Sequence, residues 1–222
     1  DYLTRQNLRV AGSVAESTPL ISAQDTDVAG IGGGDTGRDC VGTAIRQGAR
    51  CVTQLQYHEQ PPAHADVLDY WPEHVPEWHE TDHEEEGCRH IWGYDTVAIE
   101  GEGQVNRLVL QRLQWRRQRD GSWKKQPKPD EVRRLPVQLV LLALGYAHPD
   151  HEGLVDALGL ELDARGNVAA SSDDYATGVP GVFSCGDMRR GQSWVVWAIR
   201  EGRQCARSVD EYLSGDSDLP RV

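Results

Sequence analysis

The stretch Ile31-Gly32-Gly33-Gly34-Asp35-Thr36-Gly37 decides the fold of this 222-residue chain. It contains the spacing Gly-x-Gly-x-x-Gly, in which the glycines let a backbone turn approach a pyrophosphate group closely. The apolar residues Asp27 to Ile31 predict a short strand before the loop, and Thr36 to Gln47 predict a helix after it. Ala49 to Leu55 predict a second strand. This order of elements is the opening of a nucleotide-binding α/β fold.

The glycine loop is the candidate site for a dinucleotide phosphate. Its candidate residues are Gly32, Gly33, Gly34, Asp35, Thr36 and Gly37. The amino end of the following helix would add a partial positive charge and free N–H groups. An ordinary glycine-rich turn is the alternative, and the flanking strands and helix argue against it. Because Asp35 would repel a phosphate if it pointed inward, we expect it to cap the helix instead.

The end of the second predicted strand bears on the choice between NADPH and NADH. NAD-specific units usually carry Asp or Glu about 20 residues after the glycines, where it binds the ribose 2′-hydroxyl. Here the segment is Gln54-Leu55-Gln56-Tyr57-His58, without a carboxylate before Glu59. The missing acid favours NADPH. Arg50 and His58 are the nearest candidate cations for a 2′-phosphate, although both could equally be solvated side chains.

Composition excludes several other classes of function. The net charge of −12 argues against nucleic-acid binding, and no apolar run is long enough to span a bilayer. We expect neither a membrane nor a nucleic-acid partner. The chain opens without a signal peptide. Its five cysteines form no Cys-x-x-Cys pair, which argues against a disulfide framework, an iron–sulfur centre or a zinc site. These features favour a reducing, cytoplasmic location, and we expect no metal.

The middle of the chain changes character twice. Gln56 to Gly93 is rich in proline, histidine and acid, and we expect a long insertion with little regular structure. His79 and His83 could share a helix face that binds a metal, but a solvated loop is the better interpretation. Tyr94 to Leu142 predicts strands, with a hairpin from Trp115 to Lys124 that turns at Asp120-Gly121. Val137 to Leu144 is a continuous apolar run, typical of a buried central strand.

The last segment predicts a second candidate site. Gly181 to Cys185 predicts a strand that ends at Gly186-Asp187, and Ser193 to Leu213 predicts a long helix with an apolar stripe. An aspartate at a strand end can bind sugar or ribityl hydroxyls, while helix N–H groups face a flavin or phosphate oxygen. A Gly-Asp pair is also common in ordinary turns, and the sequence alone leaves both interpretations open.

Several stretches together resemble the small (beta) subunit of NADPH-dependent glutamate synthase, within the FAD-dependent pyridine nucleotide-disulfide oxidoreductases. The resemblance covers nearly the whole chain. The stretches that carry it are Asp1 to Asn7, Ile31 to Gly37, Asp39 to Thr43, Ile45 to Ala49, Val52 to Leu55, Leu141 to Gly145, Pro180 to Phe183, Gly186 to Ser193, Val195 to Ile199 and Glu201 to Arg203.

The resemblance implies an α/β fold of two kinds of domain. A Rossmann-like NAD(P)H-binding domain would span residues 25–148, and residues 149–222 would be the C-terminal part of an FAD-binding domain. Residues 1–24 would be a linker helix and loop from that FAD domain. The first FAD-binding glycine loop and the iron–sulfur cysteines of the family would lie in a region before Asp1. We therefore expect this segment alone to bind FAD poorly.

The resemblance also implies an activity and its participants. NADPH would pass a hydride to FAD, and electrons would cross iron–sulfur clusters to the large (alpha) subunit, which makes glutamate. Gly32 to Gly37 would bind the NADPH pyrophosphate, and Gly145 would lie near the nicotinamide. Gly186 and Asp187 would bind the ribityl chain, with Gln192, Ser193 and Trp194 near the isoalloxazine. Hydride transfer needs no acid or base, so we expect no catalytic side chain.

Two alternatives to this function stay open at the level of sequence. One is a different electron-transfer flavoprotein reductase that uses the same module with another partner. The other is a nucleotide-binding assembly module without turnover.

Overall fold

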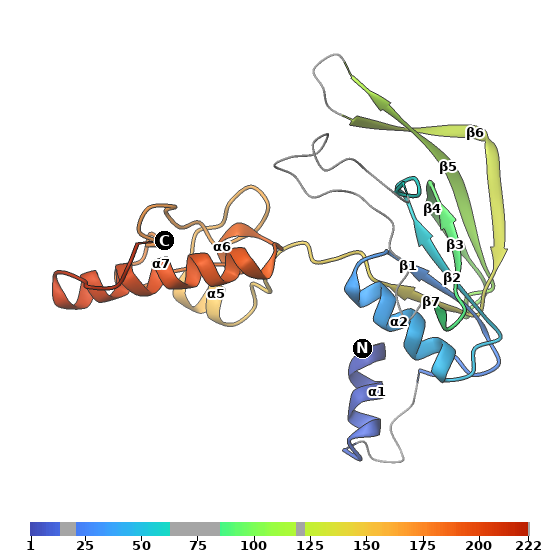
Figure 1. Ribbon diagram of the computed structural model, residues 1–222, viewed down its shortest axis with the longest axis horizontal. Helices are drawn as coiled ribbons and strands as arrows, with labels where there is room; N and C mark the ends of the chain where they lie inside the picture. Colours follow the sequence, from blue (N-terminus) through green and yellow to red (C-terminus); the bar gives the residue numbers. More distant parts are fainter. Residues whose placement is uncertain (14–20, 63–84, 119–122, 222) are drawn as a thin grey trace. The chain divides into compact units, whose positions relative to one another are not determined.

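The computed structural model describes residues 1–222 apart from 14–20, 63–84, 119–122 and 222 (Figure 1). The chain divides into two compact units, Asp1–Leu144 and Gly145–Val222. His79 and His83, for which we expect a solvated loop and no metal, lie outside the described residues, and so does the turn at Asp120-Gly121.

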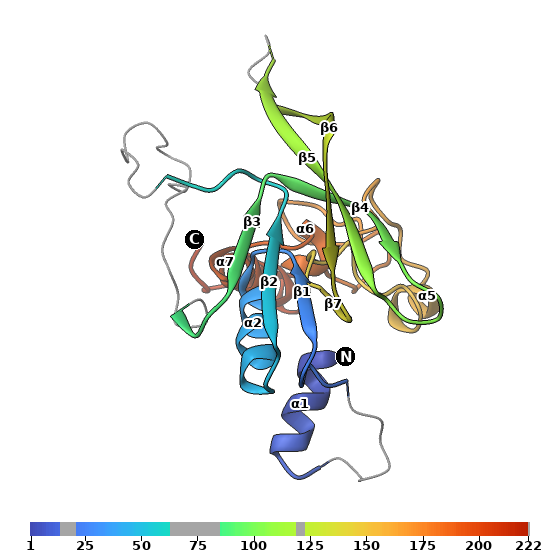
Figure 2. The same cartoon turned by 90° about the vertical axis from the view of Figure 1, so that its right-hand side faces the viewer.

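A parallel sheet forms the centre of the first unit. Its strands are β1 (Asp27–Ile31), β2 (Cys51–Gln56), β3 (Arg89–Trp92) and β7 (Leu139–Leu142), and they lie in the order β3-β2-β1-β7. All three neighbouring pairs are parallel, so the carboxyl ends of the strands share one edge (Figure 2). In an open α/β sheet this edge is where ligands bind.

One helix covers a face of this sheet, and a second helix packs against the first. α1 (Tyr2–Val10) and α2 (Asp35–Arg46) confirm the helices expected in these regions. Cys40, Val41 and Ala44 of α2 are buried against Val28 and Val52 of the sheet. These helix positions recur at intervals of three and four residues, which is why this face of α2 is apolar. The packing fixes the amino end of α2 beside the carboxyl end of β1.

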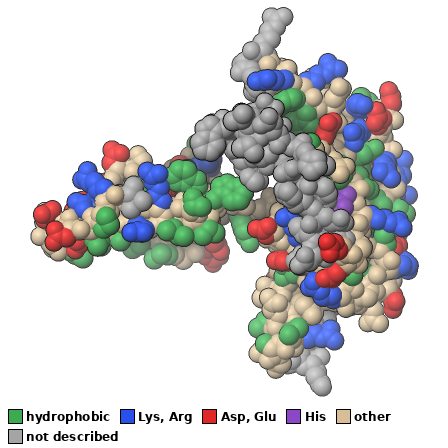
Figure 3. Space-filling model, in the orientation of Figure 1, with side chains coloured by type: hydrophobic (Ala, Val, Ile, Leu, Met, Phe, Trp, Pro, Cys, Tyr) green, Lys and Arg blue, Asp and Glu red, His purple; other side chains and the backbone are tan. Residues whose placement is uncertain are grey.

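A three-stranded antiparallel sheet covers the opposite face. It contains β4 (Tyr94–Glu100), β5 (Arg107–Arg117) and β6 (Trp123–Pro136), in that order. Leu108 and Leu110 of β5 are fully buried against Ala29 and Leu55 of the parallel sheet. β5 pairs with β6 up to Arg117 and Trp123, which confirms the expected hairpin. Charged side chains, many of them Lys and Arg, cover its outward surface (Figure 3).

Two sequence predictions about the parallel sheet are wrong. The run Val137 to Leu144 forms β7, which occupies an outer position among the four described strands, and Leu142 is 64% exposed. A continuous apolar run therefore did not distinguish a central strand from an outer one. β3 lies inside the segment expected to lack regular structure. Its sequence, Arg-His-Ile-Trp, is short and largely polar, so periodicity gave no signal for it.

The described residues of the second unit, 145–221, form three helices. They are α5 (Leu154–Leu158), the four-residue α6 (Asp187–Arg190) and α7 (Val195–Ser214), which confirms the predicted long helix. The strand expected at Gly181 to Cys185 is reduced to an isolated bridge between Phe183 and Ala176. The apolar stripe of α7 is also less buried than expected, since Cys205 is buried while Val195 and Leu213 are 73% and 74% exposed.

Within the described residues, the structure has no helix that is both long and apolar enough to cross a membrane.

Candidate functional sites at the glycine loop and at Gly186-Asp187

The glycine loop turns sharply at the carboxyl end of β1. Gly32 has φ of +117°, and a Cβ there would overlap the carbonyl oxygen of Ala143. Its N–H donates to the carbonyl of Leu55 at 3.0 Å, while Ala143 N–H donates to the carbonyl of Ile31 at 2.8 Å. The start of the loop therefore lies between the ends of β2 and β7, where only glycine fits.

The tip of the loop is open. Gly34 is exposed and is the N-cap of α2, with extended backbone angles that any residue adopts. A Cβ on Gly34 would meet no atom within 4 Å in the described structure. The first N–H groups of α2 have no acceptor within the helix and are directed out of its amino end, toward this space. The arrangement provides unobstructed backbone donors and the positive end of a helix dipole.

The prediction that Asp35 caps the helix is wrong. Asp35 is the first residue of α2, Gly34 occupies the capping position, and no side chain bonds to the cap. The Asp35 side chain is fully exposed and lies 4.0 Å from Arg38.

Two glutamine side chains of β2 contact the loop. Gln54 is 1% exposed, and its Nε2 donates to the carbonyl of Gly32 at 3.0 Å. Its Oε1 is buried and has no hydrogen-bond partner among the described residues. Gln56, the last residue of β2, lies so close to Gly33 that a Cβ there would overlap its side-chain amide. Gln56 therefore occupies the place where NAD-specific sites carry an acid.

Neither cation suggested by the sequence suits a 2′-phosphate at this edge. Arg50 precedes β2, at the amino end of the sheet, where its Nη2 bonds to Asp27 Oδ2 at 2.6 Å. His58 does follow the carboxyl end of β2, but its ring stacks on Trp115 with centroids 5.0 Å apart. Loss of water around the ring lowers the pKa of His58, which favours its neutral form. The candidate role of Arg50 is therefore wrong.

The residues expected around Asp187 come together within the second unit. Ser193 Oγ donates to Asp187 Oδ1 at 3.0 Å, and the backbone N–H of Tyr146 donates to Gln192 Oε1 at 2.8 Å. Gly145 has φ of +82°, and a Cβ on it would lie 2.5 Å from Gln192 Oε1. Trp194 is the N-cap of α7 and is 67% exposed.

A cavity of about 340 Å³ adjoins these residues. Asp187, Gln192 and Asn167 line it together with Tyr146, His148, Pro149, Asp150, Met188 and Gly191. Asn167 is 1% exposed, and its Oδ1 has no hydrogen-bond partner among the described residues. A buried amide oxygen without a partner costs free energy, so it favours a ligand that can donate a hydrogen bond.

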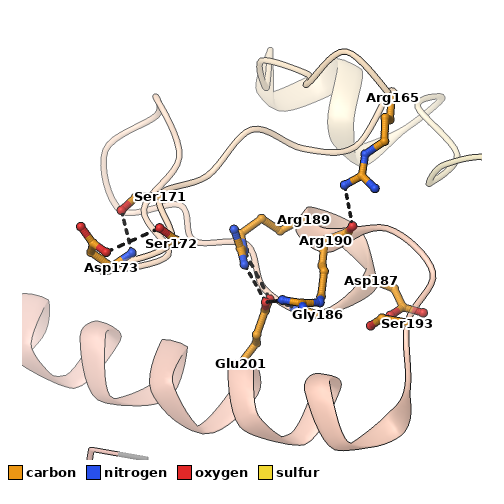
Figure 4. A network of polar contacts seen from close by, with 10 residues as sticks. All are labelled: Arg165, Ser171, Ser172, Asp173, Gly186, Asp187, Arg189, Arg190, Ser193 and Glu201. Atoms are coloured by element: carbon orange, nitrogen blue, oxygen red, sulfur yellow. Dashed lines mark hydrogen bonds and ion pairs between the residues drawn. The ribbon is translucent and has the colours of Figure 1, made fainter. Parts of the chain in front are cut away.

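Glu201 of α7 fixes the backbone of the Gly186-Asp187 turn (Figure 4). Its Oε2 accepts from the N–H of Gly186 at 2.8 Å, and its Oε1 accepts from Arg189 Nη2 at 2.6 Å and Arg190 Nη1 at 3.1 Å. The Glu201 side chain is 4% exposed and that of Arg189 17%. This buried carboxylate is fully hydrogen-bonded, and it links α6 to α7.

The same contacts predict acid sensitivity. Burial raises the pKa of Glu201, but the hydrogen bonds from Arg189, Gly186 and Arg190 outweigh it, and the pKa lies below its ordinary value. The stabilisation is therefore complete above the unfolded-state pKa of about 4.3 and is lost as pH falls through the lower folded-state pKa. We expect the free energy of unfolding, measured in urea between about pH 7 and pH 3, to fall less steeply in Glu201→Gln than in the wild type. Parallel pH profiles for the two proteins would contradict this.

Cys40 and Cys205 are both buried. Burial raises the pKa of the Cys40 thiol, and it raises the pKa of Cys205 to about 11. A thiol with a raised pKa is a poor nucleophile, so neither is a candidate for covalent chemistry.

The model of the pyridine nucleotide-disulphide oxidoreductase family matches residues 6–202. The chain belongs to this family. Among curated relatives, the glutamate synthase [NADPH] small chain of Mycobacterium tuberculosis is 42% identical over 206 residues, which cover 92% of this chain and 41% of the relative. The small chain of Bacillus subtilis is 35% identical over 99% of this chain and 46% of its own length. The chain thus spans less than half of these members of the oxidoreductase family.

A solved structure supports the fold of this family member. The FprA protein of Mycobacterium tuberculosis, in complex with NADPH, aligns with a TM-score of 0.64 at 14% identity, covering 87% of this chain and 54% of FprA. At this identity the likeness shows the fold alone. It confirms the α/β, Rossmann-like class that the glycine loop predicts.

Several residues at these sites escaped sequence analysis. Gln56 was noted only as the absence of an acid, although its side chain contacts the loop. Asn167 and Glu201 carry no recognisable spacing, because their roles depend on contacts between segments far apart in the sequence. Glu201 could have been noticed as a charged residue within the apolar stripe of a helix. Charged residues are seldom buried unless they are paired, so this position predicts a partner for its carboxylate.

Proposed function

We propose that this chain binds NADPH at Gly32–Gly37 and serves hydride transfer from NADPH to FAD in a glutamate-synthase-type flavoprotein. The observation that carries the proposal is the 42% identity to a glutamate synthase [NADPH] small chain over 92% of this chain. The family match over residues 6–202 and the open glycine loop support it independently.

The glycine loop fits a dinucleotide pyrophosphate. Gly34 leaves unfilled space in front of the free N–H groups of α2, and neighbouring Gly33 adds no Cβ. The buried Gln54 Oε1 lacks a partner among the described residues and lies on the residue that bonds to Gly32. The net charge of the chain, −12, disfavours the binding of a negatively charged phosphate. Backbone N–H donors and the helix dipole at the loop offset this repulsion locally.

The second unit fits part of a flavin dinucleotide. Asp187 supplies a carboxylate for ribityl hydroxyls, and the orphan Asn167 Oδ1 lines the same cavity. Gln192, Ser193 and Trp194 stand at the amino end of α7, where a helix dipole favours electron density on a flavin oxygen. The bound flavin supplies the hydride acceptor and its redox chemistry. The residues of this chain bind, orient and exclude water, and no side chain has to move a proton.

The curated relatives are named small chains, which supports a large subunit as partner. Electrons would pass through iron–sulfur clusters, outside the residues described, to a large subunit that forms glutamate. We propose the predicted residue ranges 25–148 and 149–222 as the NADPH-binding and FAD-binding parts.

The test combines binding with turnover. We expect NADPH to bind to this chain with a stoichiometry of one by calorimetry. In the full-length protein with added FAD, we expect NADPH to reduce an artificial electron acceptor such as ferricyanide. Binding without turnover would support an assembly module in place of an enzyme. An absence of NADPH binding would contradict the proposal.

Gln56→Glu should shift the preference between the two nicotinamide cofactors toward NADH. A carboxylate at this position would repel the 2′-phosphate of NADPH and accept hydrogen bonds from the ribose hydroxyls of NADH. We expect the ratio of Kd values to shift roughly tenfold or more toward NADH, which corresponds to at least about 1.4 kcal/mol. Fluorescence titration with each cofactor measures this ratio. Gln56→Met, which has no charge, is the matched control and should leave the ratio nearly unchanged.

A further inference from the structure

A further cavity lies at the carboxyl end of β3. Its volume is about 550 Å³, and it lies entirely within the first unit. The residues that line it are Glu59, Gln60, His90, Ile91, Trp92, Tyr94, Arg112 and Arg133. β3, β4, β5, β6 and the segment after β2 thus all contribute to it.

The cavity lies beside the glycine loop along the edge of the sheet where the strands have their carboxyl ends. Gln56 contacts Gly33 on one side, and on the other it pairs with Trp92, the last residue of β3. The N–H of Gly93 donates to the carbonyl of Gln56 at 2.8 Å. Neighbouring strands are about 4.8 Å apart, so β3 lies roughly 10 Å from β1, which is comparable to the length of an adenosine unit.

Two guanidinium groups converge on this cavity. Arg112 Nη1 donates to the carbonyl of Trp92 at 2.7 Å, and its guanidinium carbon lies 5.3 Å from the centroid of the Tyr94 ring. The guanidinium of Arg133 lies 5.7 Å from the centroid of the same ring. Among the described lining residues Glu59, 4.0 Å from Arg112 Nη2, is the one acid, and its side chain is 60% exposed. The described part of the lining is thus net positive in a chain of net charge −12.

Strand register fixes the direction of Arg133. Arg133 is paired with the fully buried Leu110, whose side chain packs toward the parallel sheet. Cross-strand partners share a face, so Arg133 lies on that face as well, whereas the adjacent Arg134 lies on the other. The two arginines differ by one residue and by the face they occupy.

We propose that Arg112 and Arg133 bind the 2′-phosphate of NADPH in this cavity. The inference rests on the proposed function, because it assumes that a dinucleotide lies on the glycine loop. Guanidinium groups suit phosphate oxygens by charge and by their planar arrangement of donors. With Arg50 paired at the other end of the sheet and His58 favoured in its neutral form, the antiparallel sheet supplies the cations for this phosphate.

The test compares Arg133→Gln with Arg134→Gln, which make the same change of charge on opposite faces of β6. The ligands are NADPH, NADH and 2′,5′-ADP, and the readout is Kd from calorimetry. We expect Arg133→Gln to weaken NADPH and 2′,5′-ADP at least tenfold and NADH less than twofold. Arg134→Gln should change none of the three. Thermal unfolding of both variants should match the wild type, because both side chains are exposed.

The outcomes separate the two claims. If the wild type binds NADPH and Arg133→Gln binds it equally well, the inference is overturned and the proposed function stands. The same holds if Arg133→Gln weakens the binding of NADPH and of NADH to the same degree. A wild type that binds neither dinucleotide overturns the proposed function and this inference together. Arg112→Gln is the secondary variant, since it also removes the hydrogen bond to Trp92.

Discussion

Gly34→Ala is expected to abolish NADPH binding, with a loss of ~100-fold or more in Kd, while the chain stays folded. The added methyl group would occupy the open space in front of the first N–H groups of α2, where the phosphate must approach. It would meet no atom within 4 Å of the described structure, and the backbone angles of Gly34 suit alanine. Loss of a glycine N-cap should lower the free energy of unfolding by no more than about 1 kcal/mol.

The matched control for this variant is Gly30→Ala. Gly30 lies in β1 just before the loop, and a Cβ there would be in ordinary contact with Val41 Cγ2 at 3.9 Å. It should fold and bind NADPH as the wild type does. Calorimetric Kd values and urea unfolding of both variants make the comparison. If the Gly34→Ala protein bound NADPH as tightly as the wild type, this would contradict the placement of the phosphate on the glycine loop.

Glu201→Ala is expected to lower the free energy of unfolding by about 3 kcal/mol. The variant would leave the largely buried guanidinium of Arg189 and the buried N–H of Gly186 without their carboxylate. Breaking a buried pair from one side costs several kcal/mol, and the partial exposure of Arg190, at 36%, keeps the estimate at the lower end. Urea denaturation followed by circular dichroism measures the difference.

A second ion pair on the same helix supplies the control. Glu211 and Arg207 lie one turn apart on α7, at 2.6 Å, with side chains 35% and 16% exposed. Glu211→Ala should cost only about 0.5 kcal/mol, as expected for an ion pair within a helix. Equal losses in Glu201→Ala and Glu211→Ala would show that the contacts around Gly186 contribute no special stability.

Local sequence patterns predicted the part of the fold that depends on neighbouring residues. The strand before Gly32 and the helix after it follow from periodicity and from the glycine spacing, and both are present as β1 and α2. The same reasoning missed β3 because Arg89–Trp92 is short, polar and stabilised by its pairing with β2. It misplaced β7 because an apolar run shows that a strand is buried without showing how many neighbours it has.

The candidate site could likewise be predicted from the sequence only in part. The glycine loop could be found from the sequence, since all of its requirements lie within a few residues. The contacts of Gln56 with Gly33, and of Arg112 with Trp92, join segments whose closeness depends on the finished sheet. Arg50 looked suitable because it lies near β2 in sequence, yet it is at the wrong end of the strand. Direction along a parallel strand decides which residues can reach the ligand.

Hydrogen–deuterium exchange with and without NADPH tests the central claim most directly, because it locates the ligand on the chain. We predict that NADPH slows exchange in peptides that contain Gly32–Arg38 at the start of α2 and Gln56 at the end of β2. Exchange in α7 should change much less when NADPH is the only ligand added. Protection confined to segments outside the carboxyl edge of the parallel sheet, or no protection at saturating NADPH, would contradict the account.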